Sequence, residues 1–199
     1  MTKVFIIHGT GGHPGENWIP WLRKELEDNG CTVIVPRFPT PIGQSLDNWL
    51  KVFEKYKSDL DSETIIIGHS VGVAFILNVL EMHELNNTSQ ETKKSEQKQV
   101  KAAYLVSGFT GTLNNPTFDL VVGSFANREF DWQKIRKNCA KFHIFHSDND
   151  PFVNINKAHE LAKQLRTSPT IIKGAGHFTI VRGYAKFPLL FEKIKEELD

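Results

Sequence analysis

Short apolar segments recur along the chain and alternate with stretches whose apolar residues follow helical spacing. The segments lie at residues 4–7, 31–35, 64–67, 103–106, 142–145 and 170–172. Most are apolar at every position and rich in Val, Ile and Phe, which is typical of strands covered on both faces in a parallel sheet. Because strand-like and helix-like segments alternate, the pattern predicts an α/β fold with about six mainly parallel strands and helices on both faces.

Amphipathic helices are expected between and after these strands, because apolar side chains recur three and four positions apart and so share one helix face. The first helix is expected to begin near Asn17. The predicted apolar faces consist of Trp18, Trp21, Leu22 and Leu26; Leu46, Trp49, Leu50 and Phe53; Val73, Ile76, Leu77 and Leu80; Ala158, Leu161, Ala162 and Leu165; and Leu190, Ile194 and Leu198.

Two segments depart from this alternation. Residues 86–99 read NNTSQETKKSEQKQ and contain no apolar side chain, so they are expected to form a solvated helix extension or a mobile loop. A partner-binding role for this segment is the less favoured interpretation. Residues 108–128 combine Gly, Asn and Pro with several large apolar side chains, and we expect a long functional loop there. No linker divides the chain, which predicts a single domain over residues 1–199.

Composition and charge exclude several classes of protein. With 199 residues, 40% hydrophobic content and a net charge of +1, the chain can bury a core and has no global field to attract nucleic acid or anionic membranes. The apolar run near the N-terminus is too short for a signal peptide, and no run approaches the roughly 20 residues of a membrane helix. We therefore expect a soluble, cytoplasmic protein. Cys31 and Cys139 each lie beside apolar residues and are expected to be reduced and buried.

The clearest chemical signal is the sequence GHSVG at residues 68–72, between a predicted strand and a predicted helix. This is the G-x-S-x-G pattern of a nucleophile elbow, a sharp turn that presents a serine hydroxyl above the carboxyl edge of a sheet. Gly68 and Gly72 would prevent collisions with the neighbouring strand and helix. The alternative is a glycine-rich turn in which Ser70 caps a helix. The strand and helix on either side favour Ser70 as a nucleophile.

A serine nucleophile needs a base, which we predict to be His177. A serine hydroxyl is weak until a histidine takes its proton and an acid orients that histidine. His177 lies in GAGHF at residues 174–178, just after the last predicted strand, where the glycines allow a loop to reach over the sheet edge. Structural roles are expected for the other downstream histidines, which are His83, His143, His146 and His159.

The acid is expected after the fifth predicted strand, where Asp148 and Asp150 compete. Asp150 precedes a proline and an apolar pair that leads into a helix, whereas Asp148 lies nearer the strand and could cap the turn. Asp150 is favoured, although the spacing alone leaves Asp148 open.

Backbone N–H groups are expected to stabilise an oxyanion formed during acyl transfer. The predicted donors are Val71, directly after the nucleophile, and Thr10, in the glycine-rich loop after the first strand. That loop has neither a dinucleotide fingerprint nor a phosphate-binding lysine, so a nucleotide site is disfavoured. His8 and His13 lack neighbouring carboxylate or cysteine ligands at metal-binding spacing, so no metal or other cofactor is expected.

Taken in order, these motifs resemble one family. The compact serine hydrolases of the retinoblastoma-binding-protein 9 type, including bacterial relatives, are similar in HGTGG at 8–12, Asn17-Trp18, GHSVG at 68–72, SDNDPFV at 147–153 and GAGHF at 174–178. The resemblance covers essentially the whole chain and implies a compact α/β-hydrolase fold. It also implies a Ser–Asp–His triad, here Ser70, Asp150 and His177, and so supports Asp150 over Asp148.

The expected function is a serine hydrolase that cleaves small or short-chain carboxylic esters, or amides, through an acyl-enzyme on Ser70. The chain is too short for a large cap domain, so the apolar part of residues 108–128 is the available cover, with Phe109 and Phe125 as candidate pocket walls. Ordinary core positions are the alternative for both phenylalanines. The competing hypothesis is a protein-binding or regulatory module that keeps the fold and has little or no turnover; the sequence itself indicates no protein partner.

Overall fold

The computed structural model describes residues 1–83 and 99–198, and its strands form one sheet. All neighbouring strands are parallel, and the order across the sheet is β2-β1-β3-β4-β5-β6. The strands are β1 (Lys3–Ile7), β2 (Thr32–Ile34), β3 (Thr64–His69), β4 (Ala102–Val106), β5 (Phe142–Ser147) and β6 (Pro169–Ile172). The predicted parallel sheet is therefore confirmed.

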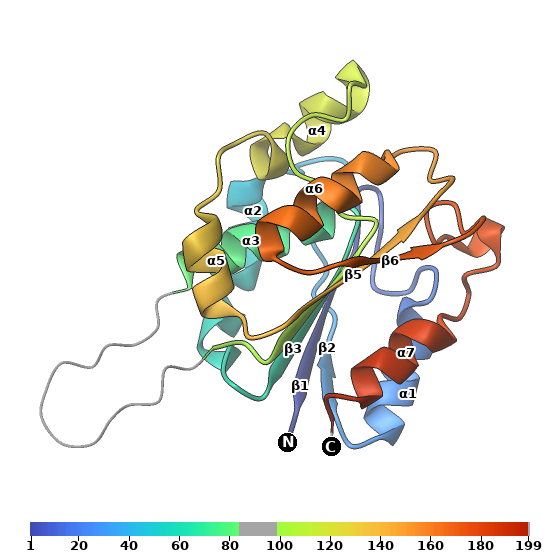
Figure 1. The fold of residues 1–199 in the computed structure, drawn as a ribbon. Coiled ribbons are helices and arrows are strands. Elements are labelled where there is room, and N and C mark those ends of the chain that lie inside the picture. Colours follow the sequence, from blue (N-terminus) through green and yellow to red (C-terminus); the bar gives the residue numbers. More distant parts are fainter. Residues whose placement is uncertain (84–98, 199) are drawn as a thin grey trace, which may run out of the picture.

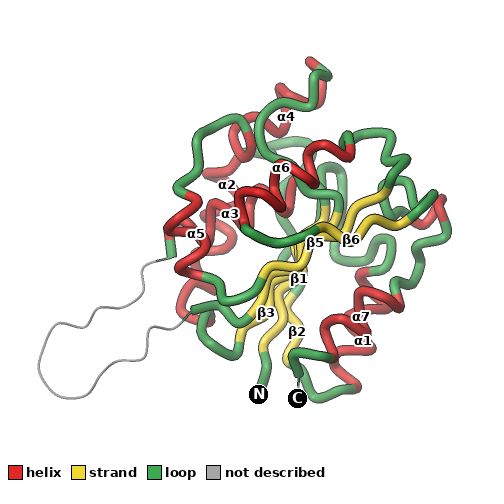
Figure 2. Tube along the Cα trace, in the orientation of Figure 1, coloured by secondary structure: helices red, strands yellow, loops and turns green. Residues whose placement is uncertain are grey.

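Helices cover both faces of this sheet (Figure 1). One face carries α1 (Ile19–Asp28) and α7 (Pro188–Lys195). The other carries α2 (Leu46–Phe53), α3 (Val71–Met82), α4 (Pro116–Ala126), α5 (Trp132–Asn138) and α6 (Ile155–Leu165). Figure 2 shows the strands, in yellow, between these two groups of helices.

Alternate residues of each central strand enter different cores, which explains why the strands are apolar at every position. In β1, Phe5 and Ile7 pack beneath α2 and α3, whereas Val4 and Ile6 pack beneath α1 and α7. Successive side chains of a strand point to opposite faces, so a sheet covered on both sides needs apolar residues at each position.

The structure corrects two sequence predictions. Residues 108–128 are not a continuous loop, because α4 occupies Pro116–Ala126, and α5 was not predicted at all. Both helices carry capping signals that were overlooked. The Asn115 side chain accepts from the backbone N–H of Phe118, and the Asp131 side chain accepts from that of Lys134. Of the polar segment 86–99, all but residue 99 lies outside the described residues.

The described residues contain neither a membrane-spanning helix nor a cluster of metal ligands. Within residues 1–83 and 99–198, no helix is long and apolar enough to cross a membrane, and no group of His, Cys, Asp and Glu is arranged to hold a metal ion. Both cysteines are unpaired and buried. Burial raises the pKa of Cys31, and it raises that of Cys139 to about 12, so neither thiol is poised to react.

Parallel strands place every loop that follows a strand at the same edge of the sheet. The segments after β1, β3, β5 and β6, which contain all the motifs noted in the sequence, therefore meet at the carboxyl edge.

Candidate active site

Ser70 occupies the sharp turn between β3 and α3. Its backbone has φ 57° and ψ −124°, a conformation that is strained for any residue other than glycine. The backbone N–H of Ser70 donates to the Val106 carbonyl of β4 at 2.9 Å, and its own carbonyl accepts from Val73 at 3.0 Å. These bonds hold the strained turn in place.

The two glycines that flank Ser70 are required by close packing. A Cβ atom on Gly68 would lie 2.7 Å from Ile76 Cδ1 and 2.9 Å from the carbonyl carbon of Gly72. A Cβ atom on Gly72 would lie 2.6 Å from the Ile7 carbonyl oxygen and 2.8 Å from that of His8. Backbone atoms cannot move aside cheaply, so the turn accommodates only glycine at both positions.

His177 and Asp150 meet across the sheet edge although 27 positions separate them. Nδ1 of His177 lies 2.8 Å from Asp150 Oδ2, and the same oxygen accepts from the Ser107 hydroxyl at 2.8 Å. Asp150 Oδ1 accepts from the backbone N–H groups of Phe152 and Val153 at 2.9 and 3.1 Å. Burial acts to raise the pKa of Asp150, but the hydrogen bond and charge of His177, with these two N–H groups, outweigh it and hold the pKa below its ordinary value.

Neighbouring polar residues hold the loop that carries the imidazole. Asp148 Oδ1 accepts from the backbone N–H of Gly174, and Asn149 Oδ1 accepts from that of Gly176, each at 2.8 Å. Of the two competing aspartates, the structure thus brings Asp150 against the imidazole and uses Asp148 to anchor the preceding turn.

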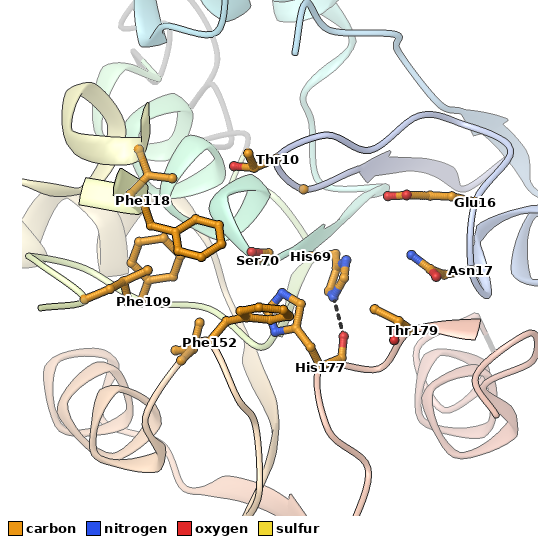
Figure 3. A pocket seen from close by; sticks show the side chains of 14 residues that line it. Thr10, Glu16, Asn17, His69, Ser70, Phe109, Phe118, Phe152, His177 and Thr179 are labelled. Atoms are coloured by element: carbon orange, nitrogen blue, oxygen red, sulfur yellow. Dashed lines mark hydrogen bonds between the residues drawn. The ribbon is translucent and has the colours of Figure 1, made fainter. Parts of the chain in front are cut away.

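Ser70 and His177 both line a cavity of about 250 Å³. Figure 3 shows the side chains around it. Within the described residues, His177 hydrogen-bonds to Asp150 but not to the Ser70 hydroxyl. The cavity is lined by Gly9, Thr10, Glu16, Asn17, His69, Ser70, Phe109, Leu113, Phe118, Val122, Phe152, Val153, His177 and Thr179.

Phe109 and Phe125 have different positions. Phe109 lines the cavity, as the sequence suggested. Phe125 is fully buried and packs edge-on against Trp49, with ring centroids 4.9 Å apart, so the structure places it in the core rather than in the cavity wall. Phe118 and Phe152, which the sequence reasoning missed, form the wall in its place. Phe152 could have been found, because it lies two positions after the candidate acid.

Both predicted oxyanion donors lie near Ser70. Thr10 lines the cavity, and its loop passes close to the serine, since a Cβ atom on Gly9 would lie 3.1 Å from Ser70 Cβ. Val71 is the first residue of α3. In the part of the chain that the structure describes, neither backbone N–H group enters a hydrogen bond. Gln44 donates to the Thr10 hydroxyl at 3.0 Å and so steadies the loop.

His69 was not considered from the sequence, yet it contacts the loop of the candidate base. Its Nε2 lies 2.9 Å from the His177 carbonyl oxygen, and the two rings lie 4.8 Å apart. Burial, with the charge of His177, lowers the pKa of His69 to about 3. His69 is therefore neutral at ordinary pH and donates its Nε2–H to that carbonyl.

His146 and His143 have structural contacts within the described residues. His146 Nε2 lies 2.9 Å from the Val153 carbonyl, and His143 stacks on Tyr104. Burial lowers the pKa of both.

Sequence comparison identifies the family. The profile of the serine hydrolase family matches residues 4–196. The chain belongs to the serine hydrolase family. Its relatives include YdeN of Bacillus subtilis (strain 168), which is 30% identical over 193 residues, or 96% of this chain and 94% of YdeN. The serine hydrolase RBBP9 of Rattus norvegicus is 32% identical over 180 residues, or 89% of this chain and 87% of RBBP9.

Solved structures agree with this assignment. The crystal structure of the ydeN gene product from B. subtilis matches this serine hydrolase with a TM-score of 0.88 at 27% identity, covering 99% of this chain and 98% of that one. Est1E from Butyrivibrio proteoclasticus shares the fold at a TM-score of 0.65 and 19% identity, covering 99% and 88%. The protein is thus a hydrolase with the α/β-hydrolase fold.

Proposed function

We propose that this serine hydrolase cleaves small or short-chain carboxylic esters, and amides less readily, through an acyl-enzyme on Ser70. The observation that carries the proposal is the 2.8 Å contact between His177 Nδ1 and Asp150 Oδ2 at a cavity that Ser70 also lines. The strained elbow at Ser70, held by glycines that no other residue could replace, supports the same assignment.

In the first half of the reaction, Ser70 Oγ attacks the ester carbonyl and its proton passes to His177 Nε2. Asp150 accepts the Nδ1–H of His177, which keeps Nε2 free to act as the base and stabilises the imidazolium that forms. The hydrogen bond from Ser70 to Nε2 is expected to close when substrate fills the cavity, as catalytic contacts often tighten in the bound state.

The negative charge that develops on the carbonyl oxygen is expected to be stabilised by the N–H groups of Thr10 and Val71. Val71 lies at the N-terminus of α3, where the helix dipole adds to the stabilisation. His177 then protonates the departing alcohol oxygen. A water molecule, deprotonated by the same imidazole, attacks the acyl-enzyme and releases the acid.

Cavity size supports a small substrate. Ligand sites usually enclose about 300–1,000 Å³, and this cavity, at about 250 Å³, is slightly smaller than that range. Its apolar wall, formed by Phe109, Phe118 and Phe152, suits a short acyl chain. We therefore expect p-nitrophenyl acetate and butyrate to be hydrolysed faster than long-chain esters.

The test is labelling by a fluorophosphonate probe together with p-nitrophenyl acetate hydrolysis. Wild type should label and turn over, and Ser70→Ala should do neither. Ser58→Ala, which changes an exposed serine in the 3₁₀ helix Glu54–Asp59, is the matched control and should retain both. A folded wild type that neither labels nor hydrolyses esters would refute the proposal and favour a binding module.

A further inference from the structure

The cavity has two chemically different walls with Ser70 between them (Figure 3). One wall is apolar and consists mainly of phenylalanine side chains. The opposite wall is polar and carries Glu16, Asn17 and Thr179. The proposed acyl chemistry uses none of these three side chains, so the polar wall is available to recognise a group of the substrate.

Glu16 is held in this wall by the shape of the backbone. A Cβ atom on Gly12 would lie 2.2 Å from Glu16 Oε1 and 2.9 Å from Glu16 Cδ, so the carboxylate rests in space that only glycine leaves open. Gly12 in turn donates its N–H to the Gly9 carbonyl at 3.2 Å, and Gly9 adjoins Ser70. The carboxylate is therefore positioned by the same loop that passes against the nucleophile.

The charge of this carboxylate is not balanced by a basic side chain. No lysine or arginine lines the cavity, and in residues 1–83 and 99–198 no ion pair includes Glu16. The titratable groups that act on it are His13 and His177. Burial raises the pKa of Glu16, opposed in part by His13, which is the sign of a half-buried carboxylate that gains from a cationic partner.

We propose that Glu16 selects ester substrates that carry an ammonium group, and that it disfavours anionic ones. This inference rests on the proposed hydrolysis at Ser70 and adds the substrate's charge. A half-buried carboxylate attracts a cation more strongly than an exposed one, because less water screens the pair. The ammonium group can belong to the alcohol or to the acyl part of the ester, and the experiment distinguishes the two.

The experiment compares kcat/KM within matched ester pairs that differ only in charge. One pair is acetylthiocholine and its isostere with tert-butyl in place of trimethylammonium, which places the charge on the leaving group. The other is the p-nitrophenyl ester of trimethylammoniobutyrate and its tert-butyl isostere, which places the charge on the acyl group. In wild type, the cationic member of one pair should be preferred by about tenfold, the size expected for the Coulombic attraction between a partly buried carboxylate and a quaternary ammonium.

Glu16→Gln should reduce that preference to near unity, because the cationic member loses its charged partner whereas the neutral isostere has none to lose. The matched control is Glu63→Gln, which removes the same charge just before β3, at the opposite edge of the sheet, and should keep the preference. A wild-type preference near unity in both pairs, or one that survives Glu16→Gln, would overturn the proposal.

A binding measurement distinguishes a failure of the role of Glu16 from a failure of the proposed hydrolysis at Ser70. Calorimetric titration of the same esters into Ser70→Ala protein measures recognition without turnover. In the pair that shows the kinetic preference, the cationic ester should bind about tenfold more tightly than its neutral isostere. This difference should vanish in the double variant that combines Ser70→Ala and Glu16→Gln. Equal binding of both members overturns the role of Glu16, whereas turnover that persists in Ser70→Ala overturns the role of Ser70.

Discussion

Acid should destabilise the folded protein through His69, and the size of the effect can be worked out. His69 is 3% exposed, and its pKa of about 3 in the fold compares with about 6.5 for a histidine in an unfolded chain. Because the folded pKa is the lower one, the unfolded state binds the additional proton. The stabilisation is complete above the unfolded pKa and is lost as the pH falls from about 6.5 toward about 3.

The expected loss follows from linkage. Between about pH 7.5 and about pH 5.0, a shift of this size lowers the free energy of unfolding by about 2 kcal/mol. Three charged or titratable groups act on His69: the charges of His177 and His8 lower its pKa, and the charge of Asp150 raises it. His8 is also buried with a lowered pKa, so the wild-type loss should exceed the contribution of His69 alone.

The assay is urea unfolding of wild type and His69→Gln at both pH values. Glutamine can still donate an N–H to the His177 carbonyl but does not titrate, so the variant's loss on acidification should be smaller than that of wild type by about 2 kcal/mol. His159→Gln, an exposed change on α6, should match wild type. If His69→Gln and wild type lose equal stability, the burial argument is wrong.

Three further outcomes are expected. Gly72→Ala should lower the free energy of unfolding by about 1–3 kcal/mol, because the added Cβ meets backbone oxygens 2.6 and 2.8 Å away. Gly123→Ala within α4 should raise it by about 0.5–1 kcal/mol, because the added Cβ has no atom within 4 Å. Thermal unfolding tests both variants, and equal effects would contradict the packing argument. Asp150→Asn should reduce kcat for p-nitrophenyl acetate by about 10⁴-fold. Asp148→Asn keeps an acceptor oxygen for Gly174, so its kcat should stay within about threefold of wild type. If Asp148→Asn had the larger effect, Asp148 and not Asp150 would be the acid. Phe118→Ala should enlarge the cavity and raise the octanoate-to-acetate ratio of kcat/KM, and an unchanged ratio would show that this wall does not contact the acyl chain.

The sequence by itself determined the layers of the fold and the order of its motifs. Continuous apolar runs indicate a sheet buried on both faces, and GHSVG between a strand and a helix favours an elbow at Ser70. These are local constraints, because periodicity and glycine placement act over a few residues. The apolar spacing of α4 and α5 is too weak to predict them, although both carry N-terminal caps, and both helices pack on α3.

Only the tertiary structure decided which side chains meet. Asp148 and Asp150 are two positions apart in one loop, yet one anchors Gly174 and the other contacts His177. Phe109 and Phe125 are residues of the same type in the same apolar segment, yet Phe109 lines the cavity and Phe125 lies in the core. The physical reason is that a contact between distant segments depends on how loops and helices pack in three dimensions, and the spacing of residues along the chain does not contain that information.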